Sequence, residues 1–298
     1  MNPGILSAAL AYVCWGLFPL YFKQLASVSP SDVLAHRIVW SLLFVLLVLT
    51  VKQHWGWLRP AIRQPKVLGA FTASALLLSA NWLTYIWSVT HDHVVDASLG
   101  YFITPLVNVL LGYTVLKERL RPAQWTAVGL AAAGVLWLAI QGGQFPWIAL
   151  VLACTFGGYG LMRKMAPLGA LEGLAMETIL LAPPAVLFLA WTLSQGTSQF
   201  PAESALVNLM LVGIGPVTAI PLLLFAAGAR RIRMSTLGLL QYIGPTIQFG
   251  LGVWLYNEPF SGSRIVGFLL IWTALAVYSI ESLLQGNAAP RAPAMEPE

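Results

Sequence analysis

The stretch Ser98–Glu118, SLGYFITPLVNVLLGYTVLKE, is an apolar run that is interrupted by Pro105 and closed by an acid. The pattern recurs in the second half of the chain, where Gly238–Glu258 reads GLLQYIGPTIQFGLGVWLYNE and Pro245 takes the place of the first proline. Apolar segments with a helix breaker at matching positions in two halves of a chain are typical of transporters and point to the substrate site. The repeat therefore predicts both the architecture and the region in which to look for function.

The composition predicts an all-α integral membrane protein. Hydrophobic residues make up 58% of the 298 residues and charged residues 9%, whereas soluble domains carry about 25% charged residues. A water-soluble fold could not bury so much apolar surface. About 20 apolar residues are needed for a helix to cross the hydrocarbon core. Ten segments are candidates: 4–23, 34–51, 67–89, 97–116, 123–141, 146–162, 173–194, 205–228, 236–256 and 264–284.

The basic residues predict the orientation of these spans. If the N-terminus is cytoplasmic, thirteen of the sixteen Lys and Arg residues fall in inner loops or in the tail, which leaves Lys23, Arg37 and Arg264 toward the outside. Such an excess of positive charge is typical of cytoplasmic loops. We therefore expect both termini in the cytoplasm, and we read the net charge of +5 as a topology signal rather than as a nucleic-acid-binding surface.

Five spans per repeat unit place the second unit upside down in the membrane. Residues 1–142 are thus predicted to form the first five-helix repeat and residues 143–285 the second, inverted repeat, with a substrate site between them. Residues 286–298, GNAAPRAPAMEPE, lack periodicity and predict a disordered cytoplasmic tail.

Polar side chains at helical spacing predict where a solute passes, because polar groups in a span face other helices or water. They serve either as hydrogen-bonded contacts between helices or as a substrate-facing surface, and for the third, fourth and ninth spans we adopt the second interpretation. The residues concerned are Asn81, Tyr85, Tyr101, Asn108, Gln241 and Tyr242.

Two charged residues inside spans, Arg37 and Glu177, are related by the same shift that relates Pro105 to Pro245. An ionisable residue within the membrane is a functional candidate by default. Arg37 would bind an anionic group or pair with an acid, and Glu177 would carry a proton or bind a cation. The structural alternatives are snorkelling of Arg37 to the interface and an internal ion pair for Glu177.

The prolines and acids of the repeated stretch are candidate gating elements. Pro105 and Pro245 free backbone carbonyls one turn earlier, although a simple kink is the alternative. Glu118 and Glu258 end their helices, where negative charge is unfavourable. Each acid therefore needs a basic or N–H partner. We interpret the two acids first as structural latches, which hold the helix ends in place, and second as gate elements.

Few features of the sequence indicate an enzyme. It contains no Gly-x-Ser-x-Gly and no His-Glu-x-x-His motif, and His91 and His93 fit a solvated turn better than a metal site. We predict no catalytic residue, no metal and no cofactor. A membrane-embedded enzyme acting on a lipid or small amphipathic substrate is the alternative; a sensor would need a soluble output domain.

Several stretches resemble the RarD branch of the EamA transporters, in the drug/metabolite transporter superfamily. They are Trp15–Lys23 (WGLFPLYFK), His36-Arg37 followed by Trp40-Ser41, Asn81-Trp82 with Tyr85 and Trp87, and Ser98–Glu118. The resemblance extends to about Gln285 and adds Trp15 and Trp82 to the predicted pathway.

The resemblance implies a bacterial inner-membrane carrier of ten helices in a 5+5 inverted repeat. Alternating access would open a central cavity lined by spans 1 to 4 and 6 to 9. RarD-like proteins carry chloramphenicol-related labels, so we expect a permease, an exporter of small organic metabolites or chloramphenicol-like drugs. The expected partners are a small-molecule substrate and the lipid bilayer, with no nucleic acid. The formation of a homodimer is left open.

Overall fold

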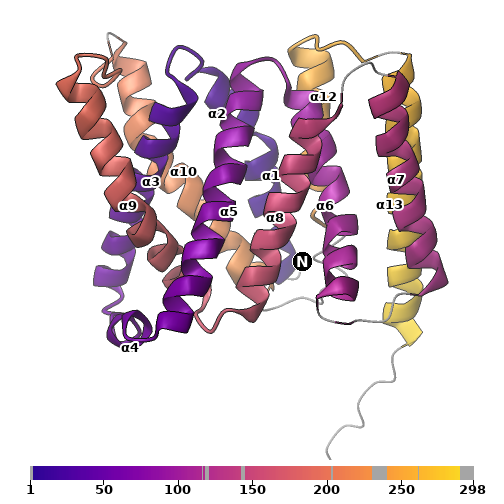
Figure 1. Ribbon diagram of the computed structural model, residues 1–298, viewed down its shortest axis with the longest axis horizontal. Helices are drawn as coiled ribbons and strands as arrows, with labels where there is room; N and C mark the ends of the chain where they lie inside the picture. Colours follow the sequence, from indigo (N-terminus) through magenta and orange to yellow (C-terminus); the bar gives the residue numbers. More distant parts are fainter. Residues whose placement is uncertain are drawn as a thin grey trace, which may run out of the picture.

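The computed structural model describes residues 3–115, 117, 121–141, 145–202, 204–229, 240–260 and 262–288. These residues form helices joined by short loops, with no strand among them (Figure 1). The helices are α1 (Pro3–Gly16), α2 (Phe18–Lys23), α3 (Pro30–Val51), α4 (Leu58–Ile62), α5 (Pro65–Thr90), α6 (Val94–Thr114), α7 (Pro122–Gln141), α8 (Trp147–Met165), α9 (Ala170–Ser194), α10 (Ala205–Ala229), α12 (Ile243–Gly250), the π-helix η1 (Leu251–Leu255) and α13 (Ser263–Ala288).

The prediction of an all-α membrane protein is confirmed. Within the described ranges, seven helical segments are long and apolar enough to cross a membrane, and three shorter apolar helices, Pro122–Leu138, Trp147–Arg163 and Ile243–Leu255, coincide with the other predicted segments. The seven are Pro3–Lys23, Pro30–Val51, Pro65–Thr90, Val94–Thr114, Ala170–Ser194, Ala205–Phe225 and Arg264–Glu281.

The first span is broken between α1 and α2 because of Pro19. Proline has no N–H to donate to the carbonyl four residues earlier, which here belongs to Trp15. The freed Trp15 carbonyl instead accepts a hydrogen bond of 2.9 Å from Nε2 of Gln248, in α12. A proline in the first half of the chain thus creates a polar contact with the second half.

Helices α3 and α9 pack side by side and run in opposite directions. The start of α3 is tied to the segment that follows α9, since Gln199 Oε1 accepts a 2.5 Å hydrogen bond from the Ser29 amide. At the other end, His54 Nε2 lies 2.7 Å from Oε1 of Glu172, in the first turn of α9. The starts of α3 and α9, at positions 30 and 170, are related by the same shift as the starts of α5 and α10, at positions 65 and 205.

Helices α7 and α13 lie together at one end of the molecule, on the right of Figure 1. Gly134 permits their close approach, because a Cβ at this position would lie 2.9 Å from the backbone oxygen of Gly267. At Gly129, earlier on α7, a Cβ would meet nothing within 4 Å. This pair sits beside the bundle rather than within it.

Part of the predicted gating machinery and of the predicted tail lies outside the described residues. Glu118 is among them, as are residues 289–298. Helix α13 continues to Ala288 and so enters the segment that the sequence assigns to the tail.

Candidate functional site

Arg37 lies in the interior of the helical bundle, on α3, and does not reach the interface. Its side chain is only 4% exposed. The guanidinium carbon lies 4.1 Å from the centre of the Trp82 ring, 5.4 Å from that of Phe22 and 5.8 Å from that of Phe18. The sequence alternative of snorkelling therefore does not apply to this structure, in which the charge sits inside an aromatic enclosure.

Asn81 links three helices next to this enclosure. Its Nδ2 donates to the carbonyl of Leu152 at 3.1 Å and to Oγ1 of Thr155 at 3.0 Å, both on α8. Its Oδ1 accepts from the Tyr101 hydroxyl at 3.4 Å, from α6. Asn81 is thus buried and hydrogen-bonded at both ends of its amide, and it connects the first half of the chain to the second.

Tyr85 and Tyr101 lie beside Asn81 and the aromatic rings around Arg37. Their ring centres are 5.9 Å apart, and Tyr85 also packs edge-on against Phe22 at 5.8 Å. The Tyr101 ring meets that of Phe156, on α8, at 5.9 Å. We name Arg37, Asn81, Trp82, Tyr85 and Tyr101 the central cluster; five of the nine predicted pathway residues therefore come together in space.

Glu177 lies in a second buried polar site, on α9. Ser74 Oγ, on α5, donates a 2.5 Å hydrogen bond to its Oε1, and the Tyr159 hydroxyl lies 3.5 Å from its Oε2. Arg163 Nη1 is 3.9 Å from Oε1. The side chain is fully buried, so a carboxylate here depends on these partners for the stabilisation that water would otherwise provide.

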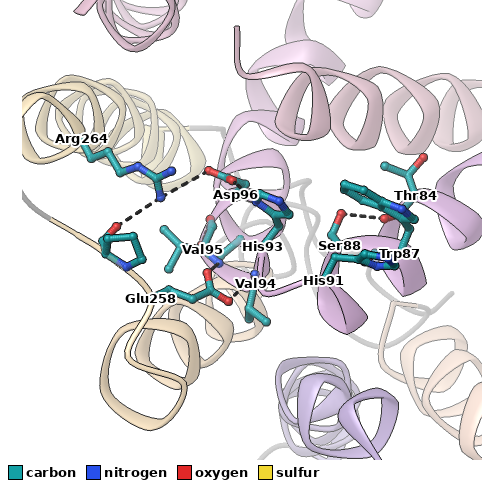
Figure 2. Close-up of polar contacts among 12 residues, drawn as sticks. Thr84, Trp87, Ser88, His91, His93, Val94, Val95, Asp96, Glu258 and Arg264 are labelled. Carbon is teal, nitrogen blue, oxygen red and sulfur yellow. Dashed lines mark hydrogen bonds and ion pairs between the residues drawn. The ribbon is translucent and has the colours of Figure 1, made fainter. Parts of the chain in front are cut away.

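Glu258 has the N–H partners that a carboxylate at the end of a helix requires. Its carboxylate accepts hydrogen bonds from the amides of Val94, at 2.7 Å, and Val95, at 2.8 Å, which are the first two residues of α6 (Figure 2). A carboxylate at a helix N-terminus is favourable, since it meets unpaired N–H groups and the positive end of the dipole. Burial raises the pKa of the Glu258 carboxyl above its ordinary value, although the two amide donors lower it.

Further polar contacts lie beside Glu258 at the start of α6. Asp96 accepts from His93 at 2.9 Å and lies 3.8 Å from Nη1 of Arg264 (Figure 2). The Trp87 ring stacks on the imidazoles of His91, at 4.7 Å, and His93, at 5.5 Å. The His91–His93 loop is therefore anchored to the end of α5 and to α13.

The other predicted residues are not members of the central cluster, although Trp15 packs on the same apolar cluster as Tyr85. Trp15 packs against Tyr12 and Phe225, with ring centres 5.4 and 5.7 Å away. Asn108 is exposed on α6, and Gln241 is half-buried in the turn before α12. Tyr242 packs on the apolar cluster that contains Phe268.

The two repeated prolines differ in their surroundings. Pro105 is buried in the interior of α6, well beyond its first turn, whereas Pro245 is the third residue of α12. A proline in the first turn of a helix removes no intrahelical hydrogen bond, because the amides there have no partner within the helix. Of these two prolines, Pro105 is therefore the one that interrupts the hydrogen bonding of a continuous described helix.

The sequence patterns do not identify several residues of the two buried sites. Phe18, Phe22 and Phe156 form walls of the central cluster, but an aromatic residue in an apolar run carries no distinguishing signal. Arg163, which the charge pattern assigns to an inner loop, instead faces Glu177 and donates from Nη2 to the Gly169 carbonyl at 2.8 Å. Its place in the second half corresponds to that of Lys23 in the first, and this match could have drawn attention to it.

Comparison with known proteins identifies the family of this chain. The model of the EamA-like transporter family matches residues 2–140. Protein RarD of Streptomyces exfoliatus is 48% identical over 94% of this chain and 89% of its own length. The chain belongs to the EamA-like transporter family, in its RarD branch. An uncharacterised transporter of Pseudomonas aeruginosa is similar as well, at 46% identity over 95% of each chain.

The fold of this RarD-type chain also has a counterpart among solved structures. A crystal structure aligns with a TM-score of 0.62 over 95% of this chain and 98% of its own, at 20% identity. That likeness concerns the fold alone. Family membership and the apolar helices together make the chain a multi-pass membrane protein of a transporter family.

Proposed function

We propose that this RarD-type chain is a secondary transporter that exports small organic metabolites or chloramphenicol-like drugs across the bacterial inner membrane. In this proposal ten helices form two inverted units of five, residues 1–142 and 143–285, with both termini in the cytoplasm. The units rock against each other, so that a solute held near the midplane meets one side of the membrane at a time.

The observation that carries this proposal is the pair of buried charges on α3 and α9. Arg37 and Glu177 occupy corresponding positions in the two halves of the chain, and their helices are antiparallel neighbours with corresponding starts. Charges within a membrane are costly and mark pathways for solutes or protons. Their matching positions favour a two-unit carrier over a chance pair of structural ions.

The central cluster is the proposed solute site, and Glu258 is the proposed gate on the outer side. The carboxylate of Glu258 holds the start of α6, whose next turns carry Tyr101. Releasing that contact would free α6 to move relative to η1 and α12. Breaking and remaking one contact at the edge of the bundle is the type of change that bistable carriers use.

Proton coupling through Glu177 is part of the proposal. The carboxyl is buried, and its partners Ser74, Tyr159 and Arg163 come from α5 and α8, the helices that also hold Asn81 and Thr155. A change in its protonation would alter contacts on the same helices that line the solute site. A facilitator without coupling is the competing mechanism, and the two differ in their response to a pH gradient.

Transport in proteoliposomes tests the proposal. Labelled chloramphenicol, aromatic amino acids and short organic acids are loaded singly, and efflux is compared with that from protein-free vesicles. We expect saturable, protein-dependent movement of at least one solute in unmodified form. No movement of any solute would contradict the transporter. Chemical conversion of a solute without movement would favour the membrane-embedded enzyme instead.

A further inference from the structure

The side chain of Arg37 has hydrogen-bonding capacity that the described part of the chain leaves unused. Its Nε and Nη1 atoms are both buried and have no hydrogen-bond partner among the described residues. Burying such donors without acceptors is costly, and burying an unpaired charge costs more. A buried arginine with unpaired donors is suited to a ligand that binds reversibly.

Three buried acids of the described segments bind other partners than Arg37. Asp32, on the same helix, accepts a 2.5 Å hydrogen bond from Ser29. Glu177 is held by Ser74, and Glu258 by the α6 amides. None of these carboxylates forms an ion pair with Arg37 in the described residues, so the central cluster carries an uncompensated positive charge.

The surroundings of the guanidinium are aromatic. Trp82, Phe22 and Phe18 face it with their rings. Among the described residues the ionisable groups that face it are the hydroxyls of Tyr85 and Tyr101, and the Tyr85 hydroxyl is itself buried without a hydrogen-bond partner. The cluster therefore combines a planar cation, a spare hydroxyl and apolar walls.

We propose that the central cluster binds an organic monoanion, a carboxylate on an aromatic or bulky apolar body, and that Arg37 is the residue that receives the carboxylate. This inference rests on the proposed transport function and narrows its cargo to the organic acids among the small metabolites, in place of neutral chloramphenicol-like drugs. A guanidinium fork matches the two oxygens of a carboxylate. The Tyr85 hydroxyl offers the acid group a further donor, and the rings bury the apolar body.

The same geometry disfavours other solutes. An amine cation would meet a second positive charge in a low-dielectric interior. Inorganic phosphate shares the affinity for a guanidinium fork, but it has no apolar part to pack against the rings of Trp82 and Phe22. A neutral solute would leave the Arg37 charge without compensation.

Calorimetric titration of the full-length protein in lipid nanodiscs tests the inference. The probes are phenylacetate and indoleacetate as acids, with phenylacetamide, phenethylamine and inorganic phosphate as comparisons. We expect both acids to bind, each comparison compound to bind at least about tenfold more weakly, and Arg37→Gln to raise the Kd of the acids at least about tenfold. Arg37→Lys should be intermediate, because it keeps the charge but loses the fork.

Arg59→Gln, at an exposed position of α4, is the matched control and should leave the Kd unchanged. The inference is overturned if neither acid binds, if the amide binds as tightly as the acid, or if Arg37→Gln leaves acid binding unchanged. Because Arg37→Gln removes an unpaired buried charge, it should fold at least as stably as the wild type. If it does not fold, the acid and amide titrations of the wild type decide.

Flux measurements separate this inference from the proposed function. If neutral chloramphenicol crosses through the protein while the arylacetates neither bind nor cross, transport stands and the anion inference fails. If the arylacetates bind through Arg37 but no solute crosses, the inference stands and the transporter fails.

Discussion

Arg37 and Glu177 are each the eighth residue of their helix, α3 and α9 respectively. The two helices pack against each other in opposite directions. Both residues also contact α5, Arg37 through the Trp82 ring and Glu177 through the Ser74 hydroxyl. A single helix thus contacts a buried cation and a buried acid, which makes α5 the element through which the two sites would influence each other.

Replacing Glu177 with Gln tests the coupling role. The amide keeps the size of the side chain but cannot exchange a proton, so we expect the stimulation of flux by a pH gradient to disappear while gradient-free flux persists. Glu172→Gln, whose carboxylate pairs with His54 at the edge of the bundle, is the control. Equal stimulation of wild type and Glu177→Gln in proteoliposomes would remove proton coupling through this residue.

Removing the Ser74 hydroxyl should destabilise the protein. Ser74→Ala deprives the buried Glu177 carboxylate of its 2.5 Å hydrogen bond, and leaving a buried acceptor unsatisfied costs about 1–3 kcal/mol. Thr72→Ala, on the exposed face of the same helix, removes only a bond to its own backbone at Leu68 and should cost less. Thermal unfolding in detergent measures both; equal losses would show that the Ser74 contact contributes nothing specific.

Two glycines of α7 should respond differently to the same change. Gly134→Ala places a methyl group 2.9 Å from the Gly267 carbonyl oxygen, and such overpacking costs about 1–3 kcal/mol. Gly129→Ala meets nothing within 4 Å and should leave stability unchanged or slightly higher. A Gly134→Ala variant as stable as Gly129→Ala would contradict the close packing of α7 on α13.

The raised pKa of Glu258 predicts a pH dependence of stability. A carboxyl with a higher pKa in the folded state than in the unfolded state takes up protons on folding. Its contribution to the free energy of unfolding is therefore greatest at or below the ordinary value of 4.5 and is lost as the pH rises through the raised folded pKa. The wild type should gain stability relative to Glu258→Gln as the pH falls from neutral toward about 4.5. A relative loss of stability in that direction would contradict the assigned shift.

The polar members of the central cluster could be singled out from the sequence, because a polar residue in an apolar span has few explanations. That reasoning points to Asn81, Tyr85 and Tyr101, and the structure brings them together. Their apolar partners could not be selected in the same way. Phe22 resembles any other residue of a hydrophobic run until the packing of α2 on α5 places its ring beside both Arg37 and Tyr85.

Partners across the chain were the least predictable feature. The sequence shows that Glu258 needs a donor and offers Arg264 as the nearby cation. The structure pairs Arg264 with Asp96 and gives Glu258 the amides of Val94 and Val95. Which helix N-terminus adjoins an acid depends on tertiary packing, and partners in opposite halves of the chain leave no local pattern.

Alternating access to the central cluster is the claim on which the account rests, and labelling of one cysteine from both sides of the membrane tests it most directly. The two native cysteines, Cys14 and Cys154, are free thiols and are first replaced by serine. Thr155→Cys is then exposed to a membrane-impermeant maleimide in right-side-out and in inverted vesicles. The account predicts labelling from both sides, with solute slowing each reaction. Labelling from one side only, or from neither under any condition, would contradict it.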